Sequence, residues 1–292
     1  MSPANRCRKS DSTSVKISKD QMTSLTDDLI CPISLELPCD PVIAEDGRIY
    51  DRPSIEEHFQ SHRGDLKSPI TNEQMGIKLL PAVQHRNTIE TLVAAGVIWG
   101  DLAAKWIEKV KEKKDTEELL KKANSGNADA MYEAGARNFY GLHGFKQDFK
   151  LGIQWYTKAH RAGNVRATVL LGGYYLNGFG VTKCCTKGMV YMSVAAGQGS
   201  NIAAYTLGMA FANGRHGFNV DKAEAIHWLG KATEDSPHDC LSYSFKHRTR
   251  VWIDQLKTSK KPRMTKHTNQ VEGWSSILNK YADFECTVKI MT

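Results

Sequence analysis

The chain has 292 residues, of which 41% are hydrophobic and 24% charged, and its formal net charge is +7. This composition is typical of globular proteins and excludes a collagen-like or wholly disordered chain. The sequence contains no run of about 18 or more apolar residues that could span a bilayer. We therefore expect no membrane partner and a cytoplasmic location, with the nucleus as a second compartment.

The seven cysteines are odd in number and scattered along the chain. Secreted disulfide-bonded proteins usually have an even cysteine framework. The first residues also lack an apolar stretch followed by a cleavage site, so no secretory signal is expected. Both features predict reduced thiols.

The first 98 residues predict a disordered leader followed by a compact module. Residues 1–24 are rich in Ser, Thr and Lys and carry few large apolar side chains, which is typical of disorder. Residues 25–98 alternate short apolar segments with turn residues and indicate an α+β module. Asp46-Gly47 predicts a β-hairpin whose two central residues tolerate positive φ. Ser54 and Glu57 predict a capping box at a helix start, and residues 87–95 predict a second helix.

Residues 99–122 form a predicted linker helix, most of it in the segment 101–122. Trp106, Ile107 and Val110 supply its apolar face. Two acidic residues precede two lysines by four positions, which favours weak attraction on one helix face: Glu117 with Lys121, and Glu118 with Lys122.

Three similar segments follow in the region 123–235, at about residues 127–163, 164–199 and 200–235. Each contains an alanine, a glycine five residues later and another glycine six residues further: Ala130, Gly135 and Gly141; Ala167, Gly172 and Gly178; Ala203, Gly208 and Gly214. Each also has an aromatic ring at the matching position of its second half: Trp155, Tyr191 and Trp228. Such a period predicts stacked helix–turn–helix pairs with one continuous core, in which small residues let helices approach closely.

These segments resemble the SEL-one-like repeat, a relative of the tetratricopeptide repeat. The resemblance rests on Trp155-Tyr156, Leu171-Gly172, Tyr174, Ala195-Ala196 and Lys222-Ala223. Glu133-Ala134 and Lys187-Gly188 depart from the family pattern. The resemblance implies an all-α solenoid that binds a protein client of unknown identity.

The module at residues 25–98 has too few ligands for a zinc-bound RING fold. Two structural zinc ions need about eight Cys or His ligands. Residues 29–98 offer Cys31, Cys39, His58, His62 and His85. We therefore expect no metal and no cofactor.

The same module resembles the U-box, a RING-like α+β fold that needs no zinc. The matching segments are CPISLEL at 31–37, DPV at 40–42, IEEHF at 55–59, SPITNE at 68–73 and LP at 80–81. The resemblance implies a ubiquitin ligase that docks a ubiquitin-charged conjugating enzyme and forms no covalent intermediate with ubiquitin. The family pattern places docking side chains at Ile33, Leu35, Pro69 and Ile70, and a thioester-positioning side chain at Asn72.

Alternatives remain for several of these residues. The alternative for Ile33 and Leu35 is that they belong to the core of the module. The alternative for Asn72 is a purely structural role in a turn. Four charged residues are candidate hydrogen-bonding partners in place of metal: Asp40, Glu45, Asp51 and Arg52. Two positions depart from the family pattern, Ala82 and His85, and Val83 is a candidate to fill the apolar volume lost there.

Residues 236–292 carry ten Lys or Arg against five Asp or Glu. They predict a basic tail or a cap on the repeats, with residues 271–282 as a capping helix. A phosphate-binding tail is the alternative, but nucleic acid is not an expected partner. A homodimer stays open, and so does a non-catalytic scaffold with an inactive U-box.

Overall fold

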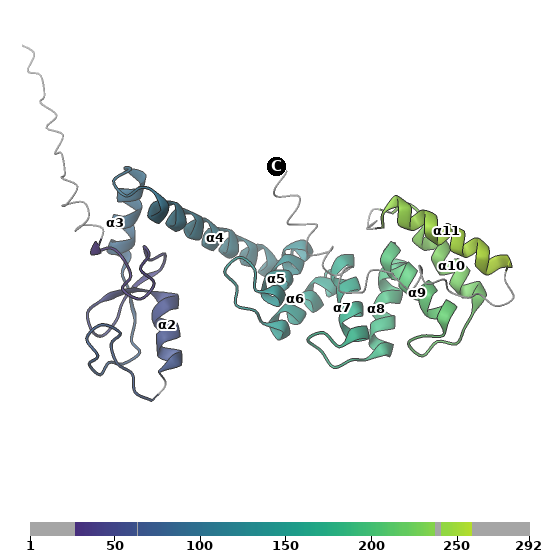
Figure 1. The fold of residues 1–292 in the computed structure, drawn as a ribbon, viewed down its shortest axis with the longest axis horizontal. Helices are drawn as coiled ribbons and strands as arrows, with labels where there is room; N and C mark the ends of the chain where they lie inside the picture. The colour runs from purple at the N-terminus through teal and green to yellow at the C-terminus, as the bar shows by residue number, and fades with distance from the viewer. Residues whose placement is uncertain (1–26, 63, 237–240, 259–292) are drawn as a thin grey trace, which may run out of the picture. The chain divides into compact units, whose positions relative to one another are not determined.

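The computed structural model describes residues 27–62, 64–236 and 241–258, which belong to two compact units (Figure 1). The N-terminal unit ends at Lys113, and the repeat unit begins at Lys114. The boundary between them falls inside one helix, α4 (Asp101–Asn124). The domain limits given above remain predictions.

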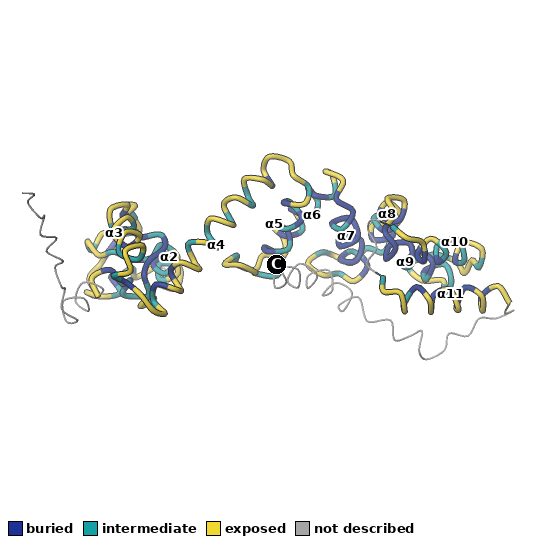
Figure 2. Tube along the Cα trace, turned by 90° about the horizontal axis from the view of Figure 1, so that it is seen from above, coloured by how far each residue is buried: buried dark blue, intermediate teal, exposed yellow. Residues whose placement is uncertain are grey.

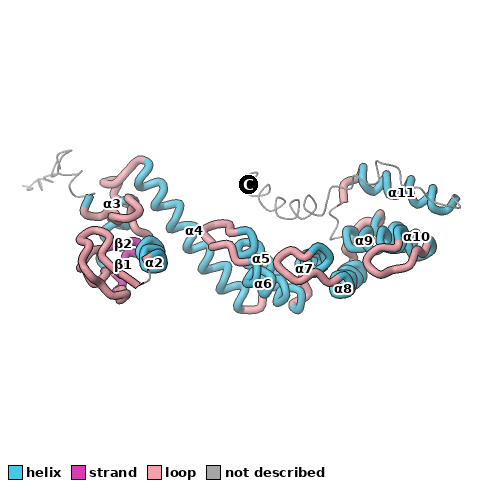
Figure 3. Tube along the Cα trace, turned by 60° about the horizontal axis from the view of Figure 1, so that its bottom comes forward, coloured by secondary structure: helices cyan, strands magenta, loops and turns pink. Residues whose placement is uncertain are grey.

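The N-terminal unit contains a small antiparallel sheet with the strand order β2-β1-β3. Figure 3 shows β1 and β2 in magenta. The strands are β1 (Pro41–Ile43), β2 (Ile49–Asp51) and β3 (Leu80–Pro81), and Val42 pairs with Tyr50 in the predicted hairpin. The turn has three residues rather than two, because Ala44 N donates to Arg48 O at 3.0 Å. Of the two predicted turn residues, Gly47 alone takes a left-handed φ, of 74°.

Helices α2 (Arg52–Ser61) and α3 (Val83–Ala94) begin earlier than the sequence predicts. The predicted capping box is wrong, since Ser54 lies inside α2. The residue before α2, Asp51, makes no side-chain cap, because its carboxylate accepts a hydrogen bond from Asp40 N at 2.9 Å. Pro53 has no backbone N–H, and it lies in the first turn, where an N–H would have no acceptor within the helix. The chain leaves β3 directly into α3, and the intervening Ala82 N donates to Pro41 O at 2.8 Å.

Two small cores hold the N-terminal unit together. One contains Val42, Tyr50 and Ile55 together with Cys31 and Met75. The second contains Leu29, Leu37, Cys39, Ile89, Ile98, Ala103 and Trp106. The start of α4 therefore belongs to the same packed body as the sheet.

Trp106 and a row of lysines join α4 to the chain before β1. The Trp106 side chain is 6% exposed, and its Nε1 donates to Pro38 O at 3.2 Å. Three lysines at four-residue spacing make ion pairs: Lys105 and Lys109 with Glu36, and Lys113 with Asp40. The prediction that Ile107 belongs to the apolar face is wrong, because Ile107 is 53% exposed. Consecutive helical residues point about 100° apart, so Ile107 does not share the buried face of Trp106.

The repeat unit is a row of helices in which each helix packs on the next one in the chain. Three pairs correspond to the three predicted copies: α5 (Ala128–Tyr140) with α6 (Phe149–Arg161), α7 (Val165–Asn177) with α8 (Cys185–Gly197), and α9 (Asn201–Asn213) with α10 (Lys222–Ala232). The middle helix α7 is the most enclosed, as its dark tube in Figure 2 shows. The end of α4 packs against the first pair through Ala123, Ala130 and Trp155.

The repeated glycines explain the close packing of each pair. A Cβ on Gly135, Gly172 or Gly208 would lie 2.6–2.9 Å from the side chain of the partner helix, which is closer than packed carbon atoms allow. The second glycine of each copy ends the first helix in the left-handed conformation that favours glycine: Gly141, Gly178 and Gly214 have φ of 68°, 81° and 63°. The glycine spacing in the sequence therefore marks both the close contact between the two helices of a pair and the end of the first helix.

A further helix, α11 (Tyr243–Thr258), covers the last pair. Trp252, Ile253 and Leu256 pack against Leu229 of α10. This is a cap, but it precedes the predicted capping helix at residues 271–282, which lies outside the described residues.

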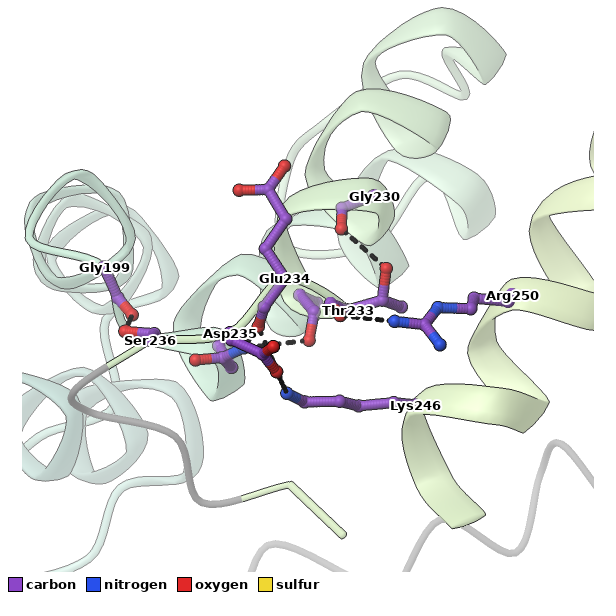
Figure 4. Close-up of polar contacts among 10 residues, drawn as sticks. Gly199, Gly230, Thr233, Glu234, Asp235, Ser236, Lys246 and Arg250 are labelled. Carbon is purple, nitrogen blue, oxygen red and sulfur yellow. Dashed lines mark hydrogen bonds and ion pairs between the residues drawn. The ribbon is translucent and has the colours of Figure 1, made fainter. Parts of the chain in front are cut away.

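Two cations of the basic segment make contacts within this cap (Figure 4). Lys246 is 6% exposed and donates to Asp235 Oδ1 at 3.0 Å and to Glu234 O at 3.2 Å. Arg250 Nη2 donates to Thr233 O at 2.9 Å. Part of the positive charge seen in the sequence therefore serves the fold.

Candidate docking surface

Two loops of the N-terminal unit share the same backbone pattern. In the first loop, Cys31 N donates to Glu36 O and Leu35 N donates to Cys31 O, both at 2.9 Å. In the second, Ser68 N donates to Glu73 O at 2.8 Å and Asn72 N donates to Ser68 O at 3.0 Å. Both loops close on themselves through the same two hydrogen bonds.

The fifth residue of each loop has a left-handed backbone. Leu35 and Asn72 both have a φ of 57°. Asparagine tolerates this region, whereas a bulky residue such as leucine adopts it only when its surroundings impose it. Leu35 is nevertheless 72% exposed. The first loop thus holds a large apolar side chain in solvent at a conformational cost of about 1 kcal/mol.

A carboxylate supports the second loop from the hairpin turn. Asp46 Oδ2 accepts from Ser68 Oγ at 2.6 Å and from Tyr50 Oη at 2.7 Å, while Oδ1 accepts from Arg48 N at 3.0 Å. Ser68 Oγ in turn accepts from the backbone N–H groups of Ile70 and Thr71 at 3.2 and 3.1 Å. A chain of hydrogen bonds therefore runs from the hairpin to the second loop.

The charge on Asp46 is stabilised by these donors. Burial alone would raise the pKa of its carboxyl group, but hydrogen bonds from Ser68, Tyr50 and Arg48 outweigh burial and lower the pKa. Burial and the bond to Asp46 also raise the pKa of Tyr50, so the phenol stays a donor at neutral pH.

The four charged residues expected to replace metal all make hydrogen bonds that tie segments together. Glu45 accepts from Gly76 N at 3.0 Å and from Lys78 N at 3.1 Å. Arg52 Nε donates to Asp40 Oδ2 at 3.2 Å, and Asp51 accepts from Asp40 N. Among the described residues, no group of three or more His, Cys, Asp or Glu side chains is arranged to hold a metal ion.

Cys31 and Cys39, the cysteines in the described part of this unit, are buried. Cys31 Sγ accepts a hydrogen bond from Asp51 N at 3.2 Å. Burial, followed by the nearby Asp51 carboxylate, raises the pKa of the Cys39 thiol to about 11. Both thiols are buried, whereas a nucleophilic cysteine is at least partly exposed.

Comparison with known families decides what these loops belong to. The U-box domain family matches residues 25–95, and the Sel1 repeat family matches residues 128–164, 165–200 and 201–236. The chain carries a U-box domain followed by three Sel1 repeats. The sheet and loops described above lie in the U-box, and the pairs α5 to α10 are the Sel1 repeats.

Several plant proteins are similar to parts of the chain. U-box domain-containing protein 19 of Arabidopsis thaliana is 35% identical over 111 residues, which are 37% of this chain and 15% of that protein. The ERAD-associated E3 ubiquitin-protein ligase component HRD3A of the same plant is 38% identical over 69 residues, or 24% of this chain and 10% of that one. The chain thus spans less than a fifth of the length of these relatives.

A solved structure is also similar to the chain. The Sel1 repeat protein from Oxalobacter formigenes is 29% identical, with a TM-score of 0.42, and the match covers 48% of this chain and 99% of that one. Within the residues that the structure describes, no helix is both long and apolar enough to cross a membrane.

The docking residues expected in the U-box differ in exposure. Leu35 and Ile70 are exposed, at 72% and 45%, whereas Ile33 and Pro69 are half-buried. Ile33 also packs against the core cluster around Tyr50. Leu35 is therefore not a core residue, and Ile33 contributes to both core and surface.

The region with Ala82 and His85 is stabilised differently from the sequence expectation. Val83 does not fill a core position, because it is 60% exposed. His85 Nε2 instead lies 3.2 Å from Leu29 O, within hydrogen-bonding distance. A polar contact to the start of the U-box is made where apolar packing was expected.

The residues that sequence reasoning missed are Asp46 as a network centre and Ser68 as a support for the second loop. The sequence places Asp46 in the turn and Ser68 in the SPITNE segment, and neither pattern indicates the other role. The spacing of 22 residues between them gives no local signal of their contact.

Proposed function

We propose that this chain is a ubiquitin ligase whose U-box docks a conjugating enzyme charged with ubiquitin. The observation that carries the proposal is the exposed Leu35, held at positive φ on a closed loop, with Ile70 exposed on a second loop of the same pattern. Exposed apolar side chains on rigid loops are typical of a protein-binding site. The name of one plant relative, an E3 ubiquitin-protein ligase component, supports the same activity.

In this proposal the U-box supplies geometry rather than a nucleophile. The conjugating enzyme's cysteine carries ubiquitin, and a client lysine attacks the thioester. Holding both reactants in one complex raises their effective concentration, which is a large source of rate. Asn72 contacts the charged enzyme and favours a reactive thioester pose, while the Sel1 repeats bind the client in the cytoplasm.

The test is autoubiquitination with purified activating enzyme, ubiquitin and a panel of conjugating enzymes. Leu35→Ala and Ile70→Ala should each reduce the ubiquitin ladder by about tenfold or more, because each truncates an exposed apolar contact. Ile77→Ala is the matched control, since Ile77 is 68% exposed in the same unit but lies outside both loops. No ladder with any enzyme would favour a non-catalytic scaffold and contradict the proposal.

Asn72 needs a variant that separates its side chain from its turn conformation. Asn72→Gly removes the amide but keeps a residue that accepts a φ of 57°. We expect unchanged affinity for the conjugating enzyme and slower discharge of its ubiquitin thioester onto free lysine. Wild-type discharge would leave Asn72 with a turn role only.

A further inference from the structure

A groove in the Sel1 repeats lies between the second and third helix pairs. Its volume is about 530 Å³, and it is bounded by α8, the end of α9, the α9–α10 loop and the start of α10. Met189 and Leu207 form a buried apolar floor. On the α8 side, Val190 is 57% exposed. An apolar groove with an exposed apolar edge is suited to bind a side chain of another protein.

The wall opposite α8 is fixed by the chain itself. Phe211 and Phe218 make an edge-to-face contact with ring centroids 4.5 Å apart. Phe218 N donates to Arg215 O at 3.1 Å, and Asp221 N donates to Phe211 O at 3.0 Å. Because both ends of the loop are held, the groove is formed before any partner arrives, which lowers the entropy cost of binding.

Positive charge predominates around the groove. Burial, then the charges of Arg215 and Lys183, lower the pKa of His216 in the groove wall, so both cations lie near it. Lys231 Nζ lies 4.8 Å from the centre of the Trp228 ring, another lining residue.

The groove also has a carboxylate, Glu224, but this group is engaged. Its Oε2 accepts a hydrogen bond from Trp228 Nε1 at 3.1 Å. A second carboxylate, Asp221, lies next to the groove and caps the N-terminus of α10. Both nearby carboxylates are therefore engaged, whereas three cations lie near groove residues, and this charge pattern complements an acidic partner.

We propose that this groove binds a short acidic segment of a client protein through one large apolar side chain. The apolar side chain lies between Val190 and Phe218, and flanking carboxylates face Lys183 and Arg215. The inference rests on the proposed function for the client role and adds the chemistry of the client.

The probe is a fluorescein-labelled peptide with one central phenylalanine flanked on each side by three aspartates or glutamates. Its binding to the full chain is measured by fluorescence anisotropy, with no ubiquitin enzymes present. Two control peptides replace either the acids by their amides or the phenylalanine by alanine. We expect each control to bind about tenfold or more weakly, and affinity to fall with added salt.

Two surface variants place the site. Val190→Glu puts a carboxylate on the edge of the groove and should weaken binding of the acidic peptide at least about tenfold. Val251→Glu is the matched control, because Val251 is 46% exposed on α11 away from the groove lining, and it should bind as wild type does. Lys183→Glu should weaken binding of the acidic peptide and leave binding of the amide peptide unchanged.

Several results would overturn the proposal. These are no binding of the acidic peptide, equal binding of the amide peptide, or wild-type affinity in Val190→Glu. A dimer that dissociates in Val190→Glu would assign the groove to a second copy. Faster hydrogen exchange of residues 259–292 in that variant would assign it to the chain's own segment. Since autoubiquitination requires no client, its outcome tests the ligase proposal separately from this one.

Discussion

Replacing Asp46 by asparagine tests whether the hydrogen-bond network holds the U-box together. The carboxylate accepts from Tyr50 Oη at 2.7 Å and from Ser68 Oγ at 2.6 Å through a single oxygen. Asparagine keeps one acceptor oxygen and places an NH₂ group where the second acceptor was, so these hydroxyls lose a charged partner. Hydrogen bonds to charged groups contribute about 1.5–3 kcal/mol. Because Asp46 is partly exposed, we expect a loss of about 2 kcal/mol in the free energy of unfolding.

Thermal unfolding can be monitored through the amide NMR signals of residues 41–51, which report on the U-box and not on the repeats. For a domain of 60–100 residues, a loss of about 2 kcal/mol lowers Tm by roughly 8–16 °C. Asp65→Asn is the matched control, because Asp65 pairs with Lys67 at 2.8 Å and accepts from Gln74 but is exposed. Its Tm should stay close to that of wild type.

The same substitution should also loosen the second docking loop. Ser68 Oγ holds the N–H groups of Ile70 and Thr71, so losing its partner frees the hydroxyl to rotate away from them. Below the Tm of the variant, affinity for the conjugating enzyme should therefore fall. If Asp46→Asn unfolds at the same temperature as Asp65→Asn and docks normally, this account of the U-box is wrong.

Three further predictions concern the pH dependence of the U-box, the packing of the repeats and the start of α4. Because folding lowers the pKa of Asp46, its carboxylate stabilises the U-box at pH values above the unfolded pKa of about 3.9. This stabilisation is lost as the pH falls through the lower folded pKa. Between about pH 5 and 2, the free energy of unfolding should therefore fall more steeply in wild type than in Asp46→Asn. Gly188→Ala should destabilise the repeats by about 1–3 kcal/mol in urea unfolding, because its Cβ would lie 2.6 Å from the Leu176 side chain. Gly197→Ala is the control: apart from its own helix backbone and chain neighbours, no atom lies within 4 Å of its Cβ, so this variant should be neutral or stabilising. Trp106→Phe removes the hydrogen bond to Pro38 O and should lower the free energy of unfolding by about 1 kcal/mol. Trp106→Ala also removes the buried ring and should lower it by about 3–5 kcal/mol. Equal effects of the two variants would contradict the packing role of this side chain.

The parts of the fold that the sequence predicted are those with a local or periodic signal. Gly47 marks the hairpin because a left-handed turn position favours glycine. The Sel1 pairs follow from spacing alone, since Gly135, Gly172 and Gly208 recur wherever two helices must approach closely.

The parts that it did not predict depend on contacts between distant residues. Ser54 carries the local signal of a helix cap, yet α2 begins at Arg52, directly after β2. The preceding Asp51 accepts a hydrogen bond from Asp40 N, eleven residues away, which no local pattern indicates. Trp106 and Pro38 are 68 residues apart, so nothing in the linker sequence indicates that α4 packs onto the U-box. The docking residues came from family resemblance, and no contact in the structure tests them.

The cap formed by α11 has a consequence for engineering the length of the repeat array. Trp252, Ile253 and Leu256 cover the face of α10 on which another helix pair would stack. A new pair appended after Thr258 would therefore find this face of α10 already covered. Duplicating residues 164–199 in place would keep both ends intact, because each copy meets the same kind of neighbour. The number of pairs can thus be changed from within the row, while the end stays closed.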